Sequence, residues 1–152
     1  MGQTSFLWLE ITGRCQLECV HCYADSSPSG THGAMTRSDW LRVLDQAVGV
    51  GVEMVQFIGG EPTLHSDLAM FVNYALDRGL AVEVFTNLVH VAETLWQAFS
   101  HPRVSLATSY YSDDSAQHAA VTQPPYSRAD ESEHHRSIAA RNSAAGRCDR
   151  SR

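Results

Sequence analysis

The feature that most constrains the fold of this chain is a regular alternation of strand-like and helix-like segments between residues 6 and 109. Four runs rich in β-branched, aromatic and aliphatic residues favour strands, and they cover residues 6–12, 54–58, 81–86 and 103–109. Apolar residues recur at helical spacing in the three segments between them. The order β-α-β-α-β-α-β, with mostly uninterrupted apolar strands, predicts a parallel sheet covered by helices.

Capping signals mark the ends of the predicted helices. Thr36, with Asp39 three residues later, resembles a capping box and is expected to start the first helix. Ser66 is expected to cap the second helix and Gly79 to end it. The third helix is expected over residues 91–99. In such folds the loops that follow the strands gather at one edge of the sheet, so we expect functional side chains there.

The alternation stops near residue 122, where the composition changes. Residues 123–152 contain one large aliphatic residue, Ile138, and six of the eleven basic residues of the chain, all of them Arg. Such a segment cannot bury enough apolar surface to offset the entropy lost on ordering. We therefore expect an α/β domain over residues 1–122 and a disordered, low-complexity tail rich in Arg, Ser and Ala over residues 123–152.

The charge of the predicted domain is negative. Residues 1–110 carry five Arg against eleven Asp and Glu, and the formal net charge of the chain is −6. This sign argues against binding to the phosphate backbone of a nucleic acid. The N-terminus has no basic n-region, and Glu10 interrupts its apolar run, so neither a signal peptide nor a membrane span is predicted. We expect a cytoplasmic protein, for which clustered cysteines indicate a metal or catalytic site rather than disulfides.

The stretch "CQLECVHC" places three cysteines in the loop after the first predicted strand, at C-x3-C-x2-C spacing. A closed zinc site would need Cys15, Cys19, Cys22 and either His21 or His32, although zinc ribbons usually supply two separated ligand pairs. A redox pair of Cys19 and Cys22 would leave Cys15 unexplained. An iron–sulfur cluster held by only three thiolates keeps one iron open for a substrate or cofactor, and this interpretation explains the missing fourth ligand.

The cysteine loop and "GGEP" at residues 59–62, each directly after a predicted strand, resemble the two motifs of the radical SAM superfamily. The resemblance covers residues 6 to about 122. It implies a partial parallel (β/α) barrel, of which about the first four βα units are present. It also implies a [4Fe–4S] cluster on the three cysteines, with S-adenosylmethionine (SAM) chelating the fourth iron. Reductive cleavage of SAM would then give a 5′-deoxyadenosyl radical that abstracts hydrogen from a substrate.

The resemblance further implies a set of residues around SAM. These are His21, Gly59, Gly60, Glu61, Pro62, Thr86, Asn87 and Ser109. The two glycines would let the backbone approach the cofactor closely, and Glu61 would accept a hydrogen bond from its amino group. His21 would lie near the adenine. Thr86, Asn87 and Ser109 stand at the ends of the third and fourth strands, where such residues are also ordinary turn formers.

The stretch "LATSYYSDD" is most similar to radical SAM proteins of the peptide-maturation type, which carry an added C-terminal cluster domain. The resemblance therefore implies a substrate that the sequence does not identify, with a peptide as one candidate. It also implies a reductant protein such as a ferredoxin or flavodoxin. No fifth or sixth strand is recognisable, and Cys148 is expected to be a free thiol. We expect a truncated core domain that has weak or no activity alone. A natural truncation or out-of-frame sequence would account for the shortening. The alternative is a non-catalytic iron–sulfur or zinc-binding remnant that depends on a partner chain.

Overall fold

Four strands form one parallel sheet in the computed structural model, which describes residues 5–122. The sheet order follows the sequence, β1-β2-β3-β4, and every neighbouring pair is parallel. The strands are β1 (Phe6–Thr12), β2 (Met54–Gly59), β3 (Ala81–Phe85) and β4 (Val104–Ala107). The helices are α1 (Arg37–Gly49), the 3-10 turn η1 (Pro62–Leu64), α2 (Leu68–Asp77), α3 (Glu93–Phe99) and α4 (Ser115–Thr122). The predicted α/β class and the parallel sheet are confirmed.

The ends of the helices follow the sequence signals with one exception. Thr36 and Asp39 form the predicted capping box at the start of α1, with the carboxylate of Asp39 accepting from the Thr36 backbone N–H at 2.8 Å. Gly79 has a φ of +86° just beyond α2, as expected for a helix stop. The prediction that Ser66 caps α2 was wrong. The N-cap is Asp67, which makes no side-chain cap bond because its carboxylate pairs with Arg37 at 2.6 Å.

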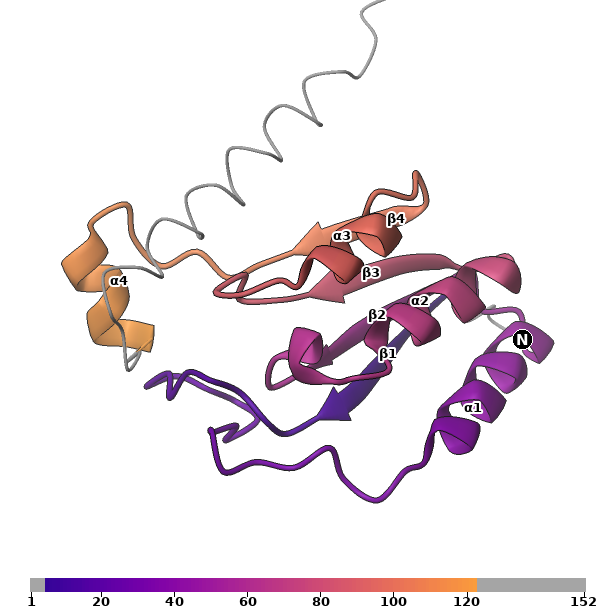
Figure 1. Cartoon of the computed structure of the whole chain (residues 1–152), viewed down its shortest axis with the longest axis horizontal. Helices are drawn as coiled ribbons and strands as arrows, with labels where there is room; N and C mark the ends of the chain where they lie inside the picture. The colour runs from indigo at the N-terminus through magenta and orange to yellow at the C-terminus, as the bar shows by residue number, and fades with distance from the viewer. Residues whose placement is uncertain (1–4, 123–152) are drawn as a thin grey trace, which may run out of the picture.

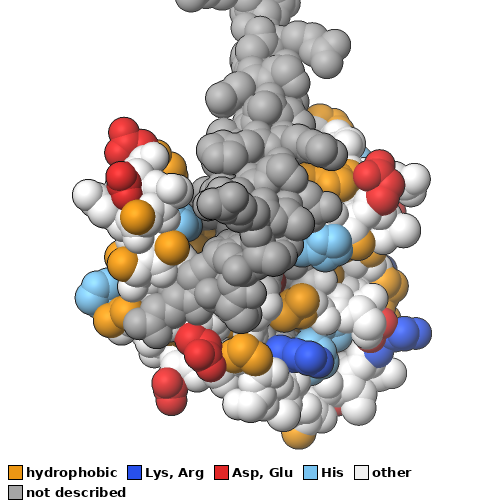
Figure 2. Space-filling view, turned by 60° about the vertical axis from the view of Figure 1, so that its left-hand side comes forward, with side chains coloured by type: hydrophobic (Ala, Val, Ile, Leu, Met, Phe, Trp, Pro, Cys, Tyr) orange, Lys and Arg blue, Asp and Glu red, His pale blue; other side chains and the backbone are white. Residues whose placement is uncertain are grey.

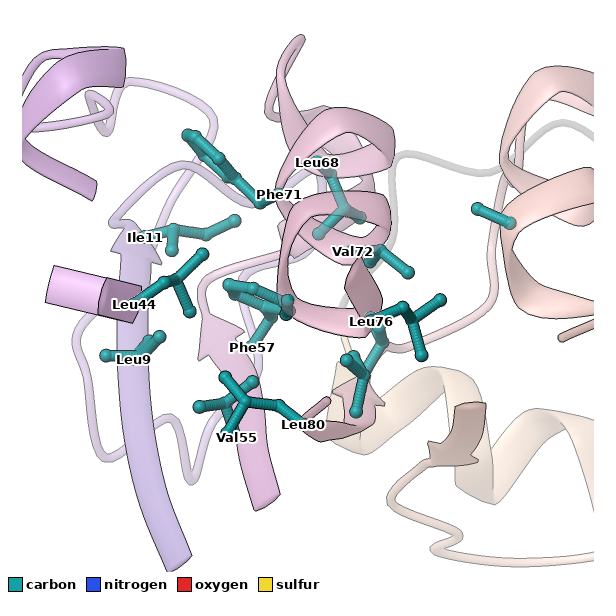
Figure 3. Close-up of a cluster of buried hydrophobic side chains, with 14 of the residues drawn as sticks. Leu9, Ile11, Leu44, Val55, Phe57, Leu68, Phe71, Val72, Leu76 and Leu80 are labelled. Atoms are coloured by element: carbon teal, nitrogen blue, oxygen red, sulfur yellow. The ribbon is translucent and has the colours of Figure 1, made fainter. Parts of the chain in front are cut away.

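Helices α1, α2 and α3 cover the same face of the sheet, where alternate strand residues form the main core. Figure 3 shows Ile11 of β1 and Phe57 of β2 grouped with Leu44 of α1 and Phe71 of α2. Burying such side chains contributes about 1.5 to 3 kcal/mol each. This layer holds the strands rigidly in register and so determines where the loops that follow them meet.

Beyond the carboxyl ends of the strands lies α4, toward which the strand arrows in Figure 1 point. The end of this helix contacts the cysteine loop through backbone bonds. The N–H of Val20 donates to the carbonyl of Val121 at 3.0 Å, and that of Glu18 donates to Thr122 at 3.3 Å. The sequence analysis did not predict α4, which has only a weak apolar face because its apolar residues are small.

Two expectations concern parts of the chain that are not described. The disorder expected for residues 123–152 and the free thiol expected at Cys148 both lie outside residues 5–122. Among the helices that the structure does describe, we find none long and apolar enough to span a bilayer.

Candidate functional site

The cysteine loop follows β1. Its first residues form backbone hydrogen bonds with the residues that follow the third cysteine. The N–H of Gly13 donates to Thr31 O at 2.8 Å, and the N–H of Cys15 donates to Ser27 O at 3.0 Å. Between these anchors, the N–H of Cys22 donates to Cys19 O at 3.0 Å and turns the chain back toward the sheet. The two ends of the loop are therefore fixed, and its three cysteines line one cavity.

The three thiols are free and differ in their surroundings. Cys15 is 7% exposed, and its sulfur accepts from the N–H of Leu17 at 3.4 Å. Burial raises the pKa of the Cys15 thiol to about 11, and burial with the neighbouring Cys22 raises the pKa of Cys19. Thiols of this kind stay protonated in water, whereas a bound metal ion deprotonates them outright. Cys15 and Cys19 are therefore poor free nucleophiles, and a bound cation would favour the thiolate forms that burial disfavours.

Gly59 and Gly60, at the end of β2, pack against the backbone at the start of the cysteine loop. The N–H of Gly60 donates to Thr12 O at 2.7 Å. A Cβ at Gly59 would lie 2.2 Å from Thr12 O, and one at Gly60 would lie 2.3 Å from Arg14 O. Gly59 also has a φ of +139°, which L side chains rarely adopt. The glycines are expected from the sequence to let the backbone approach a cofactor, and in the structure they also let the backbone of the cysteine loop approach closely.

Glu61 is turned inward, with 0% of its surface exposed. Its Oε1 accepts from Thr63 N–H at 3.0 Å, from the Thr63 hydroxyl at 2.7 Å and from the Thr86 hydroxyl at 2.7 Å, while its Oε2 accepts from Asn87 N–H at 2.7 Å. Burial raises the pKa of this carboxyl, and the four donors act in the opposite direction. Glu61 thus ties the loop after β2 to the end of β3.

Asn87 connects the end of β3 to the first cysteine. Its side-chain amide forms a reciprocal pair with that of Gln16, at 3.2 and 3.3 Å, and its Nδ2 lies 3.6 Å from the sulfur of Cys15. Its Oδ1 also accepts from the N–H of Val89 at 3.0 Å. The polar end of β3 therefore supports the thiol that is most deeply buried.

One cavity of about 130 Å³ at the carboxyl edge of the sheet brings most of the predicted residues together. Of these residues, Cys15, Cys19, His21, Cys22, Gly59, Gly60, Asn87 and Ser109 line it. Glu61, Pro62 and Thr86 are not among the lining residues and are buried beside it. His32, a candidate zinc ligand, lies elsewhere, with its Nδ1 2.8 Å from the hydroxyl of Thr12 and its ring 4.7 Å from that of His65.

The donor set fits an iron–sulfur group. The cavity lining contains three thiols, and backbone N–H groups of Leu17 and Ser26 donate to two of their sulfurs. Hydrogen bonds of this kind are typical around cluster sulfurs. Within residues 5–122 as they stand, no three His, Cys, Asp or Glu side chains converge closely enough to surround a single ion. The three thiols line a common cavity and do not form a binding site for a single metal ion.

Further residues line the cavity that the sequence analysis did not name. They include Ser26 beside Cys22, the exposed Tyr23, and Tyr111, His118 and Thr122 from the segment after β4. Gln16 pairs with the lining residue Asn87 but is not itself in the lining. The rings of Tyr111 and His118 contact each other with centroids 5.8 Å apart. No spacing in the sequence links residues 111–122 to the cysteine loop. The stretch "LATSYYSDD" at residues 106–114 carried a resemblance to the peptide-maturation type, but nothing in it placed Tyr111 beside the cysteines.

Figure 2 brings the loop end of the molecule toward the viewer. In the part of this face that the structure describes, basic side chains (blue) occur singly, among scattered hydrophobic, acidic and histidine side chains. The described atoms visible on this face form no continuous basic patch.

Comparison with known proteins identifies the family. The model of the radical SAM superfamily matches residues 9–133, which is most of the chain. The chain belongs to the radical SAM superfamily. Membership implies chemistry based on SAM and an iron–sulfur cluster, in agreement with the resemblance seen in the sequence.

Similar proteins differ in activity and are much longer. A SAM-dependent nucleotide dehydratase of Selenomonas ruminantium is 38% identical over 80 residues, which are 52% of this chain and 28% of the relative. A PqqA peptide cyclase of Bradyrhizobium diazoefficiens is 38% identical over 81 residues, 53% of this chain and 21% of the relative. The chain therefore spans about a quarter of the length of these relatives.

The fold is also found in solved structures. SuiB of Streptococcus suis bound to the precursor peptide SuiA has a TM-score of 0.72 at 22% identity, over 80% of this chain and 27% of SuiB. The same protein bound to SAM gives a TM-score of 0.71 at 21% identity, over 80% of this chain and 28% of SuiB. These likenesses show that the four βα units have the radical SAM fold.

Proposed function

We propose that the cavity binds a [4Fe–4S] cluster through Cys15, Cys19 and Cys22, with SAM beside it on the side of Gly59 and Gly60. The observation that carries this proposal is that a cysteine loop and a glycine motif, 37 positions apart between Cys22 and Gly59, line a single cavity. When bound and reduced, such a cluster supplies the electron that cleaves SAM to methionine and a 5′-deoxyadenosyl radical.

The protein residues around the cavity would perform distinct tasks. Asn87 and Gln16 hold Cys15 in place through their amide pair. Glu61, through Thr86 and Asn87, maintains the position of the glycine backbone relative to β3. His21 and Ser109 line the cavity and could contact SAM directly. Such pre-organised support matters because small displacements of a reacting group cost orders of magnitude in rate.

The substrate we propose is a peptide, and the electron donor is a ferredoxin- or flavodoxin-like protein. The support for a peptide is the peptide cyclase activity named for the PqqA relative and the complex of SuiB with the precursor peptide SuiA. Residues 1–122 would serve as the core that holds the cofactors. Because the relatives are several times longer, we expect the 152-residue chain by itself to position SAM loosely and to cleave it slowly.

Anaerobic reconstitution with iron and sulfide tests the proposal. We expect about four irons per chain by analysis, a cluster signal in electron paramagnetic resonance after reduction, and slow formation of 5′-deoxyadenosine from SAM. Tetrahedral zinc as the only metal retained would refute the cluster. A stable cluster with no trace of 5′-deoxyadenosine, even with a reductant protein present, would instead favour a non-catalytic iron–sulfur protein.

A further inference from the structure

Two buried side-chain polar atoms have no hydrogen-bond partner among the described residues, and they lie in different places. One is Nε1 of Trp40, on the helix-covered face of the sheet, where its ring packs against Phe71. The other is the hydroxyl of Ser26, which is only 6% exposed and lines the cavity with the three cysteines. A hydroxyl that is buried without a partner destabilises the protein, so a partner is expected.

The backbone places Ser26 directly at one of the thiols. The N–H of Ser26 donates to the sulfur of Cys22 at 3.3 Å. The same residue therefore has one donor already in use on Cys22 and a second donor, the hydroxyl, without a partner. Ser27 differs, because its hydroxyl pairs with that of Ser29 at 2.9 Å and Ser27 is not among the cavity-lining residues.

Resting on the proposed function, we propose that Ser26 is a cofactor-contacting residue whose hydroxyl donates a hydrogen bond to the iron–sulfur group at the Cys22 position. Reduction adds negative charge to that group, and a hydrogen-bond donor stabilises the charge. Hydrogen bonds to the sulfurs are one of the features that set the potential of a cluster. The Ser26 hydroxyl would therefore raise the reduction potential and make the cluster easier to reduce.

The test compares Ser26→Ala with Ser27→Ala, the same substitution at the next position of the same loop. Each variant and the wild type are reconstituted anaerobically, and the midpoint potential is measured without SAM by a redox titration followed by electron paramagnetic resonance. Thermal unfolding of the cluster-free proteins is measured in parallel. We expect Ser26→Ala to shift the midpoint to more negative potential and Ser27→Ala to leave it unchanged.

The unfolding measurement separates a contact to the cofactor from a structural role. In the cluster-free protein the Ser26 hydroxyl has no partner to lose, so Ser26→Ala should leave the unfolding temperature unchanged or raise it. Loss of iron in Ser26→Ala alone, with unfolding unchanged, would also support the contact. Equal midpoints in Ser26→Ala and wild type would overturn the inference, as would a lower unfolding temperature with no shift in potential. Failure of the wild type to bind a cluster would overturn the proposed function as well.

Discussion

The two loops that form the cavity are built differently. The loop after β2 is held by protein contacts alone, since Glu61 is fully buried and accepts four hydrogen bonds from neighbouring residues. In the loop after β1, Cys19 and Cys22 are half-buried, Val20 and Tyr23 are exposed, and the Ser26 hydroxyl has no described partner.

This difference indicates which half of the site is formed before a cofactor arrives. A carboxylate that accepts four hydrogen bonds needs nothing further, whereas three neighbouring thiols can be held together by a metal that binds them as thiolates. We infer that the glycine loop is a preformed wall and that the cysteine loop gains its final order from the cluster. Substitutions in the first loop should therefore affect folding, and substitutions in the second should affect metal binding.

The largest expected effect is the loss of the cluster in Cys19→Ala. The Cys19 side chain is small and only half-buried, so removing its thiol should change the free energy of unfolding by less than about 1 kcal/mol. Iron bound after reconstitution should fall to the background level. Cys148→Ala is the control and should retain full iron. Normal iron content in Cys19→Ala would show that the three-cysteine assignment is wrong.

Glu61→Ala should have the opposite profile, with a large effect on folding. Removing the carboxylate leaves the hydroxyl of Thr86 and the N–H of Asn87 buried without their acceptor, which should destabilise the protein by about 2 to 4 kcal/mol. Chemical denaturation of the cluster-free chain measures this change. Glu53→Ala removes an exposed carboxylate just before β2 and should stay within about 0.5 kcal/mol of wild type. If both variants were equally stable, the glycine loop would not depend on Glu61.

Gly60→Ala tests the contact between the two loops. Its Cβ would lie 2.3 Å from Arg14 O, so the loops must separate, at a cost of about 1 to 3 kcal/mol. Gly49→Ala is the matched control, because a Cβ at this position, at the end of α1, would meet open space. It should be neutral or stabilise the protein by up to about 1 kcal/mol. Denaturation of both variants under one set of conditions gives the comparison. A Gly60→Ala protein as stable as Gly49→Ala would contradict the close approach.

The smallest effect concerns pH and the histidine beside the glycine loop. Burial and the neighbouring His32 lower the pKa of His65, whose Nδ1 accepts from the N–H of Asp67 at 3.1 Å. As the pH falls, His65 therefore becomes protonated in the unfolded chain at a higher pH than in the folded chain. The free energy of unfolding should fall as the pH drops from about 7 through the lowered pKa. Denaturation between pH 7.5 and 5 measures this slope. His65→Gln should make the slope shallower, and an unchanged slope would exclude His65 as its source.

Local sequence patterns were sufficient to predict the sheet and most of its helices. The strand runs, the capping box of Thr36 and Asp39, and the stop at Gly79 depend on neighbouring residues, which is why they could be predicted. The cap of α2 could not, because the competing salt bridge of Asp67 comes from Arg37, 30 positions away.

Local patterns also indicated which residues would lie together at the carboxyl edge of the sheet. Three cysteines and two glycines occur in recognisable spacings, and they line the cavity together with Asn87 and Ser109. The inward orientation of Glu61 depends on donors at the end of β3, and the approach of α4 depends on contacts across the whole domain. Neither leaves a local pattern. Their roles toward a cofactor remain predictions for the experiments described above.

The backbone bonds between α4 and the cysteine loop have a consequence for the order of events during synthesis. Val20 and Val121 are about 100 residues apart, and closing so long a segment is entropically costly until the sheet has formed. The partners of the Glu61 carboxylate lie no later than Asn87, so this side chain can complete its hydrogen bonds while residues 88–122 are still being made. The cysteines thus stay accessible to an assembly factor until late in translation. Pulsed hydrogen exchange during refolding should show the amides of Glu18 and Val20 becoming protected after that of Asn87.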